Sequence, residues 1–345
     1  MQARTAKYAL VCAGLLGATT TMQARSAPMA HETIGGIVRE APGLDALIAP
    51  GAAIEKLAEG YQWTEGPVWI ARGQYLLFSD VPGNAMHRWS QKDGASVFLK
   101  PSGYDGPDPS MFREPGSNGL IPGPGNTILL ADHGNRSVAR LDLATRRKTF
   151  LASRYDGKKF NSPNDLVLAR NGAIYFTDPP YGLAGMNDSP HKEQKVNGVY
   201  RLDPDGKVTL VEAGLTWPNG IILSPDERRL YITVSDPKHA VVMVYDRGRE
   251  GAISNGRVFA DMTASVSDQN PGLPDGMAID SRGNLFSTGP GGVHVFAPDG
   301  RELGLIRTGA AIANCTFGGP DGRTLFLASN HMIARLPTRT KGLGF

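Results

Sequence analysis

Glu65-Gly66-Pro67-Val68 is the first of six segments in which an oxygen-bearing side chain leads an apolar run, followed by a turn and a second apolar run. The other five segments are Asn118-Gly119-Leu120-Ile121, Asn164-Asp165-Leu166-Val167, Asn219-Gly220-Ile221-Ile222, Asp275-Gly276-Met277-Ala278 and Asn314-Cys315-Thr316-Phe317. The leading residues are 53, 46, 55, 56 and 39 residues apart. Repeats of roughly 40–50 residues built from short strands are typical of β-propeller blades. The sequence therefore predicts an all-β fold, a six-bladed β-propeller with four-stranded blades.

The last repeat is shorter than the others, and this predicts how the ring closes. After the sixth leading residue the chain offers only three apolar runs, at Thr316–Phe317, Thr324–Ala328 and Met332–Leu336. An N-terminal strand at Ala53–Ala58 can supply the missing outer strand, and this pairing removes two open sheet edges. We therefore expect residues 51–345 to form one propeller domain.

The N-terminus differs in composition from the rest of the chain. Arg4 and Lys7 precede an apolar run of 11 residues, and small and polar residues follow it. This pattern predicts a signal peptide over residues 1–27, with an uncertain cleavage site, and a tether over residues 28–50. An apolar run of this length is too short to span a bilayer. We expect the protein to be exported, to the periplasm where the cell has an outer membrane and to the medium where it has none.

Charge and motif content exclude several classes of function. The formal net charge of +3 comes from three basic residues within the first 27, so the remainder is formally neutral. No basic stripe with interleaved aromatic residues occurs, which argues against a nucleic-acid partner. The sequence also lacks the serine-hydrolase elbow, the His-Glu-x-x-His zinc motif and the phosphate-binding loop. Oligomeric state is left open by the sequence.

The six leading residues predict a metal site. Equivalent positions of propeller blades surround one axis, so two carboxylates and four amides should converge on the central channel. Oxygen ligands of this kind suit Ca²⁺. The alternative is that each Asn-Gly or Asp-Gly pair is only a turn, but the recurrence of the polar residue at one blade position favours the metal. A second polar layer is expected at the ends of the second strands, at Asp80, Asp132 and Asp178.

Five ordered motifs resemble those of the gluconolactonase/SMP-30 (regucalcin-like) family, and in particular its exported bacterial branch. They are Trp63-Thr64-Glu65-Gly66-Pro67-Val68-Trp69, Ser162-Pro163-Asn164-Asp165-Leu166, Tyr175-Phe176-Thr177-Asp178-Pro179-Pro180-Tyr181-Gly182, Pro218-Asn219-Gly220 and Leu273-Pro274-Asp275-Gly276-Met277. The resemblance covers roughly residues 50–340. It implies a six-bladed propeller that carries a divalent cation, often Ca²⁺, in its channel.

The resemblance also implies individual roles. The metal ligands fall on Glu65, Asn164, Asn219 and Asp275, and the catalytic acid or base falls on Asp275. Asn164 binds metal or substrate in different members. One departure is Ser162, where animal members carry a sugar-binding Arg, so their substrate contacts do not carry over.

Further substrate contacts are expected from the residues around this cage. The candidates are Asp178, Tyr181, Asn118, Arg113 and Glu114. Asn118 and Asn314 could instead be structural or hold a second ion.

These residues lead to a functional hypothesis with two alternatives. We expect metal-dependent hydrolysis of glucono-1,5-lactone or a similar aldonolactone, with the cation acting as a Lewis acid and Asp275 orienting or deprotonating water. The first alternative is a related hydrolase of other lactones or phosphotriesters, because the same cage polarises P=O as readily as C=O. The second is a propeller that binds without catalysis. Neither the preferred lactone nor the metal used in the cell follows from the sequence.

Overall fold

Six antiparallel sheets of four or five strands make up most of the chain that the computed structural model describes, which is residue 2 and residues 31–343. Blade one contains β4 (Thr64–Ile70), β5 (Tyr75–Asp80), β6 (Ala85–Ser90) and β7 (Gly94–Leu99). Blade two contains β8 (Ser117–Pro122), β9 (Thr127–Asp132), β10 (Ser137–Asp142) and β11 (Lys148–Ala152). Blade three contains β14 (Leu166–Leu168), β15 (Ile174–Asp178), β16 (Gly198–Leu202) and β17 (Val208–Glu212).

The second half of the ring repeats this order. Blade four contains β18 (Pro218–Leu223), β19 (Arg229–Asp236), β20 (His239–Arg247) and β21 (Ile253–Asp261). Blade five contains β22 (Met277–Ile279), β23 (Leu285–Gly289), β24 (Gly292–Phe296) and β25 (Glu302–Arg307). Blade six contains β26 (Asn314–Gly318), β27 (Thr324–Ser329) and β28 (Met332–Pro337).

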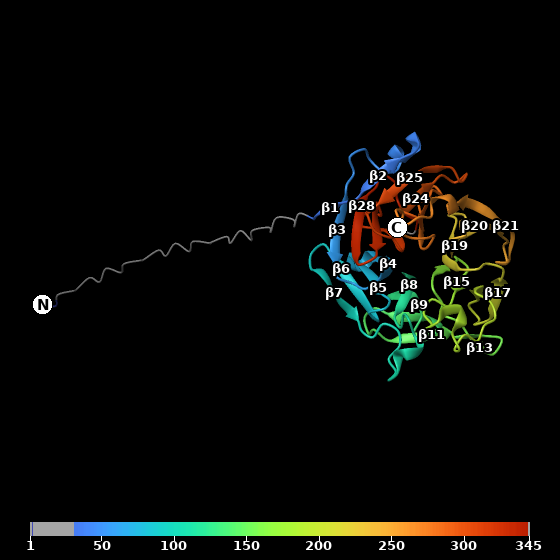
Figure 1. The fold of residues 1–345 in the computed structure, drawn as a ribbon. Helices are drawn as coiled ribbons and strands as arrows, with labels where there is room; N and C mark the ends of the chain where they lie inside the picture. Colours follow the sequence, from blue (N-terminus) through green and yellow to red (C-terminus); the bar gives the residue numbers. More distant parts are fainter. Residues whose placement is uncertain (1, 3–30, 344–345) are drawn as a thin grey trace. The chain divides into compact units, whose positions relative to one another are not determined.

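The innermost strands form a closed ring, as Figure 1 shows. β4 contacts β8 and β26, β14 contacts β8 and β18, and β22 contacts β18 and β26. This arrangement confirms the expected six-bladed propeller. Within the described residues, no helix is long and apolar enough to cross a membrane.

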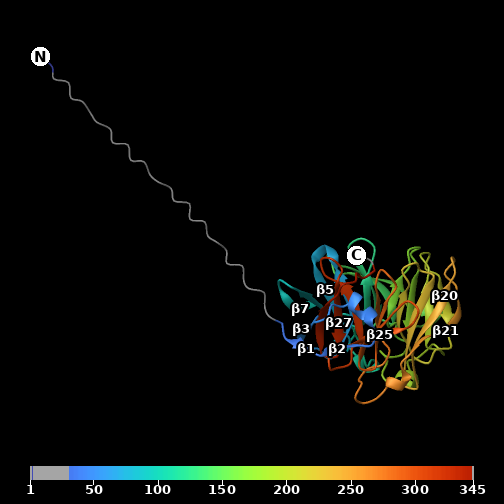
Figure 2. The ribbon, with the colours of Figure 1, turned by 90° about the horizontal axis from the view of Figure 1, so that it is seen from above.

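The N-terminal part of the described chain closes the ring. β3 (Ile54–Glu59) pairs with β28 as the fourth strand of blade six, which confirms the expected closing strand. β1 (Thr33–Ile34) extends this sheet, and β2 (Gly36–Arg39) pairs with β25 of blade five. Figure 2 shows these three strands beside the C-terminal blades.

The expected tether over residues 28–50 is therefore wrong for most of its length. Its apolar side chains find partners in the last two blades: Leu44, Leu47 and Ile48 are buried in the cluster that includes β25 and β27 residues. These three residues lie in or beside a 3-10 helix, η1 (Pro42–Ala46). The expected signal peptide, residues 1–27, lies outside the described residues, so export stays a prediction.

The loops hold the remaining short elements. The two long loops contain the 3-10 helices η3 (Pro109–Met111) and η4 (Met186–Asp188), and an isolated bridge joins Phe112 to Leu183 across them. The loop over residues 101–116 thus lies against the loop over residues 183–197. The other short elements are η2 (Ala71–Gly73), η5 (Thr263–Ser265) and the hairpin of β12 (Arg154–Tyr155) and β13 (Lys158–Lys159).

Hydrogen bonds join every pair of neighbouring blades at the level of the six leading residues. Side-chain hydroxyls at three junctions donate to the carbonyl oxygen of the next leading residue: Ser79 to Asn118 at 2.9 Å, Thr177 to Asn219 at 2.6 Å and Thr233 to Asp275 at 2.9 Å. Backbone amides close three more, from Gly119 to Asn164, Gly276 to Ala313 and Thr64 to Asn330. We call this set of bonds the inter-blade belt.

Glycine follows the leading residue at four of the six positions because neighbouring inner strands approach closely there. A Cβ on Gly66 or Gly220 would overlap the backbone carbonyl of Asn118 or Asp275, respectively. Gly66 also has a φ of 49°, which disfavours other residues. In blades one, two and four a β-bulge lies beside the leading residue, and a bulge redirects a side chain. The Asn-Gly and Asp-Gly pairs are thus packing elements of the channel wall.

Thr233 provides a direct test of the inter-blade belt. Its buried hydroxyl accepts a bond from the Gly220 amide at 2.7 Å and donates to Asp275. Thr233→Val keeps the shape and leaves both partners unsatisfied, so we expect a loss of about 1–3 kcal/mol in unfolding free energy. Thr233→Ser, which keeps the hydroxyl, should recover most of it. Equal denaturation midpoints for wild type and Thr233→Val would contradict this role.

Candidate functional site

The amide side chains of three leading residues form a hydrogen-bonded row across blades two to four. Asn118 Nδ2 donates to Asn164 Oδ1 at 2.9 Å, and Asn164 Nδ2 donates to Asn219 Oδ1 at 2.6 Å. Asn219 Nδ2 in turn donates to Ser235 Oγ at 2.9 Å. The amide oxygens of Asn164 and Asn219 each accept one hydrogen bond along the row. An amide oxygen has two lone pairs, so the Asn219 oxygen keeps one available to a cation.

The two acidic leading residues, Glu65 and Asp275, lie on blades one and five. Glu65 is 2% exposed, and its Oε2 accepts bonds from the Gly66 amide at 2.8 Å and from Asn314 Nδ2 at 3.0 Å. Asp275 is partly exposed, and its amide donates to Thr288 Oγ1 at 3.1 Å. Asn314 therefore positions Glu65 directly. The structure brings together all six leading residues that the repeat singled out.

Glu65 and Asp165 are buried at this level and Asp275 is partly exposed, and none of the three forms an ion pair with another described residue. Burial, together with repulsion from the nearby acids Asp165 and Glu114, raises the pKa of Glu65 to about 8. Burial also raises the pKa of Asp275 well above its ordinary value, with additional repulsion from Glu65 and Asp165. The pKa of Asp165 is raised to about 7, again by burial. Such a group of acids is costly unless protons or a cation neutralise it.

Glu114 differs from these acids because the side chains of Arg113 and His133 lie against it. Burial alone would raise its pKa, but bonds to His133 and the charges of His133 and Arg113 lower it below its ordinary value. Glu114 Oε2 lies 3.4 Å from His133 Nδ1, and Glu114 Oε1 accepts from the Arg113 guanidinium. His133 Nε2 faces Asn164 Oδ1 at 3.2 Å. A connected series of contacts thus runs from the exposed Arg113 to the buried amide row.

Aromatic side chains flank the row on blades three and four. Tyr181 stacks on Trp217 with ring centroids 5.5 Å apart and an interplanar angle of 10°. Burial raises the pKa of the Tyr181 hydroxyl, which lies beside Ser235 and within the field of Asp275. Tyr181 therefore stays protonated and can donate a hydrogen bond at this side of the site.

The expected second polar layer is only partly correct, because its acids serve the blades' own loops. Asp80 Oδ1 accepts from the Gln62 and Trp63 amides, and Asp132 binds Lys148 at 2.6 Å. Asp178 is fully buried, and its Oδ2 accepts from the Asn161 amide at 2.8 Å. The Asp178 carboxylate is thus held by the segment before Asn164, and its expected contact with substrate stays a prediction.

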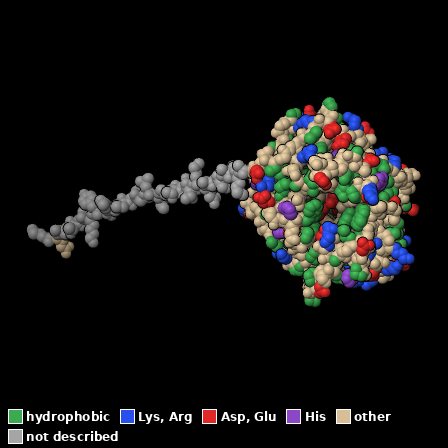
Figure 3. Space-filling view, viewed as in Figure 1, with side chains coloured by type: hydrophobic (Ala, Val, Ile, Leu, Met, Phe, Trp, Pro, Cys, Tyr) green, Lys and Arg blue, Asp and Glu red, His purple; other side chains and the backbone are tan. Residues whose placement is uncertain are grey.

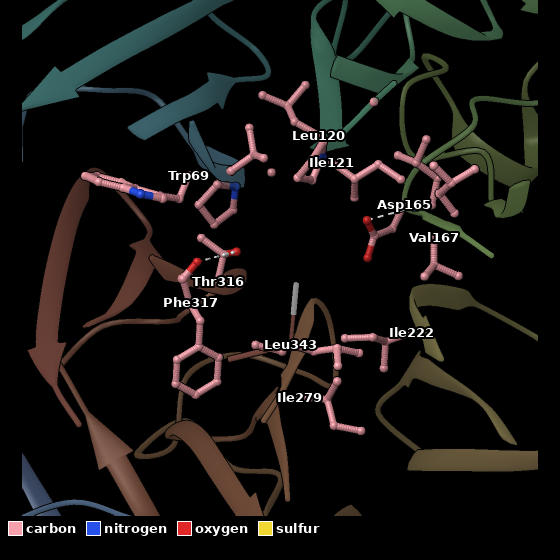
Figure 4. Close-up of a pocket in the computed structure, with 18 of the residues that line it drawn as sticks. Trp69, Leu120, Ile121, Asp165, Val167, Ile222, Ile279, Thr316, Phe317 and Leu343 are labelled. Atoms are coloured by element: carbon pink, nitrogen blue, oxygen red, sulfur yellow. Dashed lines mark hydrogen bonds between the residues drawn. The ribbon is translucent and has the colours of Figure 1, made fainter. Parts of the chain in front are cut away.

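Beyond the leading residues the channel widens into an apolar cavity. Its volume is about 710 Å³, and inner-strand residues of all six blades line it together with Leu343. Figure 3 shows apolar side chains around a hollow at the centre of the ring. In Figure 4 Asp165 projects toward this cavity, and its Oδ1 accepts from the Leu166 amide at 2.9 Å. The reactive groups therefore lie at the polar end of the channel.

Sequence reasoning missed several contributors to the site. Ser235 contacts Asn219 and the Pro274 carbonyl, and Thr288 holds the Asp275 amide. His133 is fully buried against the amide row. The strand-end hydroxyls at Ser79, Thr177, Thr233 and Thr288 could have been found, because they recur beside the ends of the second strands.

The residues present fit a Ca²⁺ ion. Within the part of the chain described here, no group of three or more His, Cys, Asp or Glu side chains is placed to hold a metal ion. Glu65, Asn164, Asn219 and Asp275 instead offer two carboxylates and two amide oxygens, a set of oxygen ligands that Ca²⁺ binds with water completing the shell. A cation there would also neutralise the buried acids.

Comparison with known proteins places these features in a family. A family model described as the SMP-30/Gluconolactonase/LRE-like region matches residues 63–331. A gluconolactonase from Zymomonas mobilis subsp. mobilis is 46% identical over 328 residues, which are 94% of this chain and 92% of that protein.

Solved structures agree with this match. A gluconolactonase from Xanthomonas campestris has a TM-score of 0.73 and 31% identity, covering 89% of this chain and 98% of that one. A calcium-binding regucalcin from Agrobacterium tumefaciens has a TM-score of 0.65 at 19% identity, covering 90% of this chain and 95% of that one, and supports the fold alone. With a family model matching most of its length, the chain belongs to the SMP-30/gluconolactonase/LRE-like family.

Proposed function

We propose that this protein is a lactonase that hydrolyses glucono-1,5-lactone or a similar aldonolactone to the aldonic acid, and that it depends on a divalent cation, Ca²⁺ in the first instance. The main support for a bound cation is this group of carboxyls with raised pKa values, which form no ion pair among the described residues. The relatives named as gluconolactonases support the choice of substrate.

Four side chains would hold the cation: Glu65, Asn164, Asn219 and Asp275. When bound, the cation supplies Lewis-acid polarisation of the lactone carbonyl oxygen. Asn118 would stay outside this set, because its amide donates to Asn164 Oδ1 and so fixes the orientation of a ligand. Asn314 does the same for Glu65.

Asp275 is the residue we assign to proton transfer. It is the partly exposed carboxyl of the group, whereas Glu65 is almost fully buried. Its carboxylate would take a proton from the attacking water as that water adds to the lactone carbonyl carbon, and would return it to the ring oxygen as the ring C–O bond breaks. Beside a divalent cation the carboxylate is a weak base, which is sufficient for a reactive cyclic ester and insufficient for an amide.

The residues at the mouth would orient the sugar. Glu114, kept ionised by His133 and Arg113, can accept bonds from substrate hydroxyls. Arg113 is half exposed and can donate to them. Tyr181 lies on the side of Asp275 and can donate from its protonated hydroxyl.

Replacing Asp275 by Asn tests the proton-transfer role. The amide retains an oxygen for the cation but cannot accept the proton of water, so we expect kcat for glucono-1,5-lactone to fall by about 10²-fold or more. Acid release at constant pH measures the rate, and Ca²⁺ titration checks that the cation still binds. Asp299→Asn, in an exposed turn, is the matched control. A Ca²⁺-loaded Asp275→Asn variant with a near-normal rate would refute the assignment.

The raised pKa values predict how Ca²⁺ binding and pH are linked. In the cation-free fold Glu65 holds a proton up to a pH of about 8, while an unfolded Glu loses it near its ordinary value of 4.5. The native state therefore binds more protons, so its stability falls as pH rises between these values. Ca²⁺ must displace the protons, so its affinity should rise over the same interval.

Calorimetry in buffers of different ionisation enthalpy measures this release. We expect protons to be released on Ca²⁺ binding at pH 6.5, and fewer of them in Glu65→Gln. A Ca²⁺ affinity that is equal at pH 6 and pH 8.5, with no proton release, would show that the buried acids are not the ligands.

A further inference from the structure

Different kinds of side chain lie around the mouth of the channel. They are found two positions before the leading residue of each blade. In blades four and five these residues are Trp217 and Leu273, and both are partly exposed. Proline follows each of them, and a residue before proline is held in extended conformation. Side chains two residues apart in extended chain point to the same side. Leu273 therefore lies on the same side as Asp275. In blade four a β-bulge interrupts this alternation, and Trp217 is instead placed beside Asn219 by Ser235, which bonds both residues.

The equivalent positions in blades two and three lack this apolar bulk. They are Gly116 and the fully buried Ser162, whose hydroxyl donates to the Pro179 carbonyl at 2.6 Å. The space on this side is occupied by the loop that carries Arg113 and Glu114, and the Arg113 amide donates to the Gly182 carbonyl at 2.9 Å.

Gly182 has to be a glycine in this arrangement. A Cβ there would lie 2.8 Å from both the His133 and Ser162 Cβ atoms. This tight packing holds the charged loop beside Tyr181, on the side of the mouth away from Leu273.

Trp217 is held rigidly at its position. Its carbonyl accepts from the Ser235 amide at 2.9 Å, and its indole stacks on Tyr181. Ser235 Oγ also bonds Asn219, so the indole is fixed relative to one of the proposed cation ligands. A rigid, partly exposed aromatic surface beside a reaction centre offers a large apolar contact at little entropic cost. Neither blade packing nor the proposed catalytic chemistry uses this exposed surface.

We propose that Trp217, backed by Tyr181, is the platform on which one face of the sugar-lactone ring packs. This inference rests on the proposed function. A six-membered aldonolactone with equatorial hydroxyls directs its C–H bonds to the two ring faces and its hydroxyls to the rim. Packing one face on Trp217 turns the rim hydroxyls toward Glu114 and Arg113 and leaves the carbonyl over Asn219 and Asp275. Trp217 is thus a specificity-determining residue that orients the substrate.

The test separates substrate binding from chemistry. Trp217→Ala should raise KM for glucono-1,5-lactone about tenfold or more, which corresponds to roughly 1.4 kcal/mol per tenfold, with a much smaller change in kcat. Trp217→Phe should recover most of the loss, because a smaller aromatic face remains. Ca²⁺ affinity should be unchanged in both variants. Phe150→Ala, which removes an exposed aromatic side chain from β11, is the matched control and should behave as wild type.

A binding readout without catalysis completes the test. Gluconate, the reaction product, should change the tryptophan fluorescence of the Ca²⁺-loaded wild-type protein, and Trp217→Phe should lose most of that change although the other three tryptophans remain. Wild-type turnover combined with an unchanged KM in Trp217→Ala would overturn this inference and leave the lactonase proposal standing. Failure of the Ca²⁺-loaded wild type to hydrolyse any lactone would overturn both.

Discussion

The close approach of neighbouring inner strands is the constraint on which the rest of this structure depends. Six blades can bring one residue each to a common axis only if their inner strands nearly touch, and glycines after four leading residues permit that contact. Hydroxyl and amide donors then fix the strands, at every junction, through bonds to backbone carbonyls at this level. The inter-blade belt thus determines where the functional side chains lie, and a bond lost from it displaces a candidate ligand as well as a strand.

This geometry concentrates negative charge. Asp165 raises the pKa of Glu65, and Glu65 and Asp165 both raise the pKa of Asp275. The cationic side chain of Arg113 lies outside this group, against Glu114. A folded chain can tolerate such a group only in protonated form or with a bound cation. The fold and the proposed cofactor are therefore linked, because the convergence that builds the cage also makes an empty cage costly.

Much of the fold was predictable because each repeat of the sequence corresponds to one blade of the propeller. The spacing of leading residues gave six blades, and the missing strand of the last repeat led to β3. The role of residues 33–46 was not predictable in the same way. Their short apolar runs form strands by joining the sheets of blades five and six, most of whose residues lie more than 200 positions later in the chain.

The residues of the site were likewise predictable only in part. The six leading positions could be found from their recurrence, whereas the bond between the Asn161 amide and the Asp178 carboxylate could not, because it depends on the path of the segment before Asn164. The contacts of Ser235 and His133 depend on side-chain packing between blades, and no single repeat contains that information.

A crystal structure of the protein grown with Ca²⁺ tests the central claim most directly. The account predicts one strong anomalous peak on the channel axis, with oxygens of Glu65, Asn164, Asn219 and Asp275 at about 2.3–2.6 Å. A peak elsewhere in the channel, or none at this level with Ca²⁺ in excess, would contradict the claim that the leading residues form a cation cage.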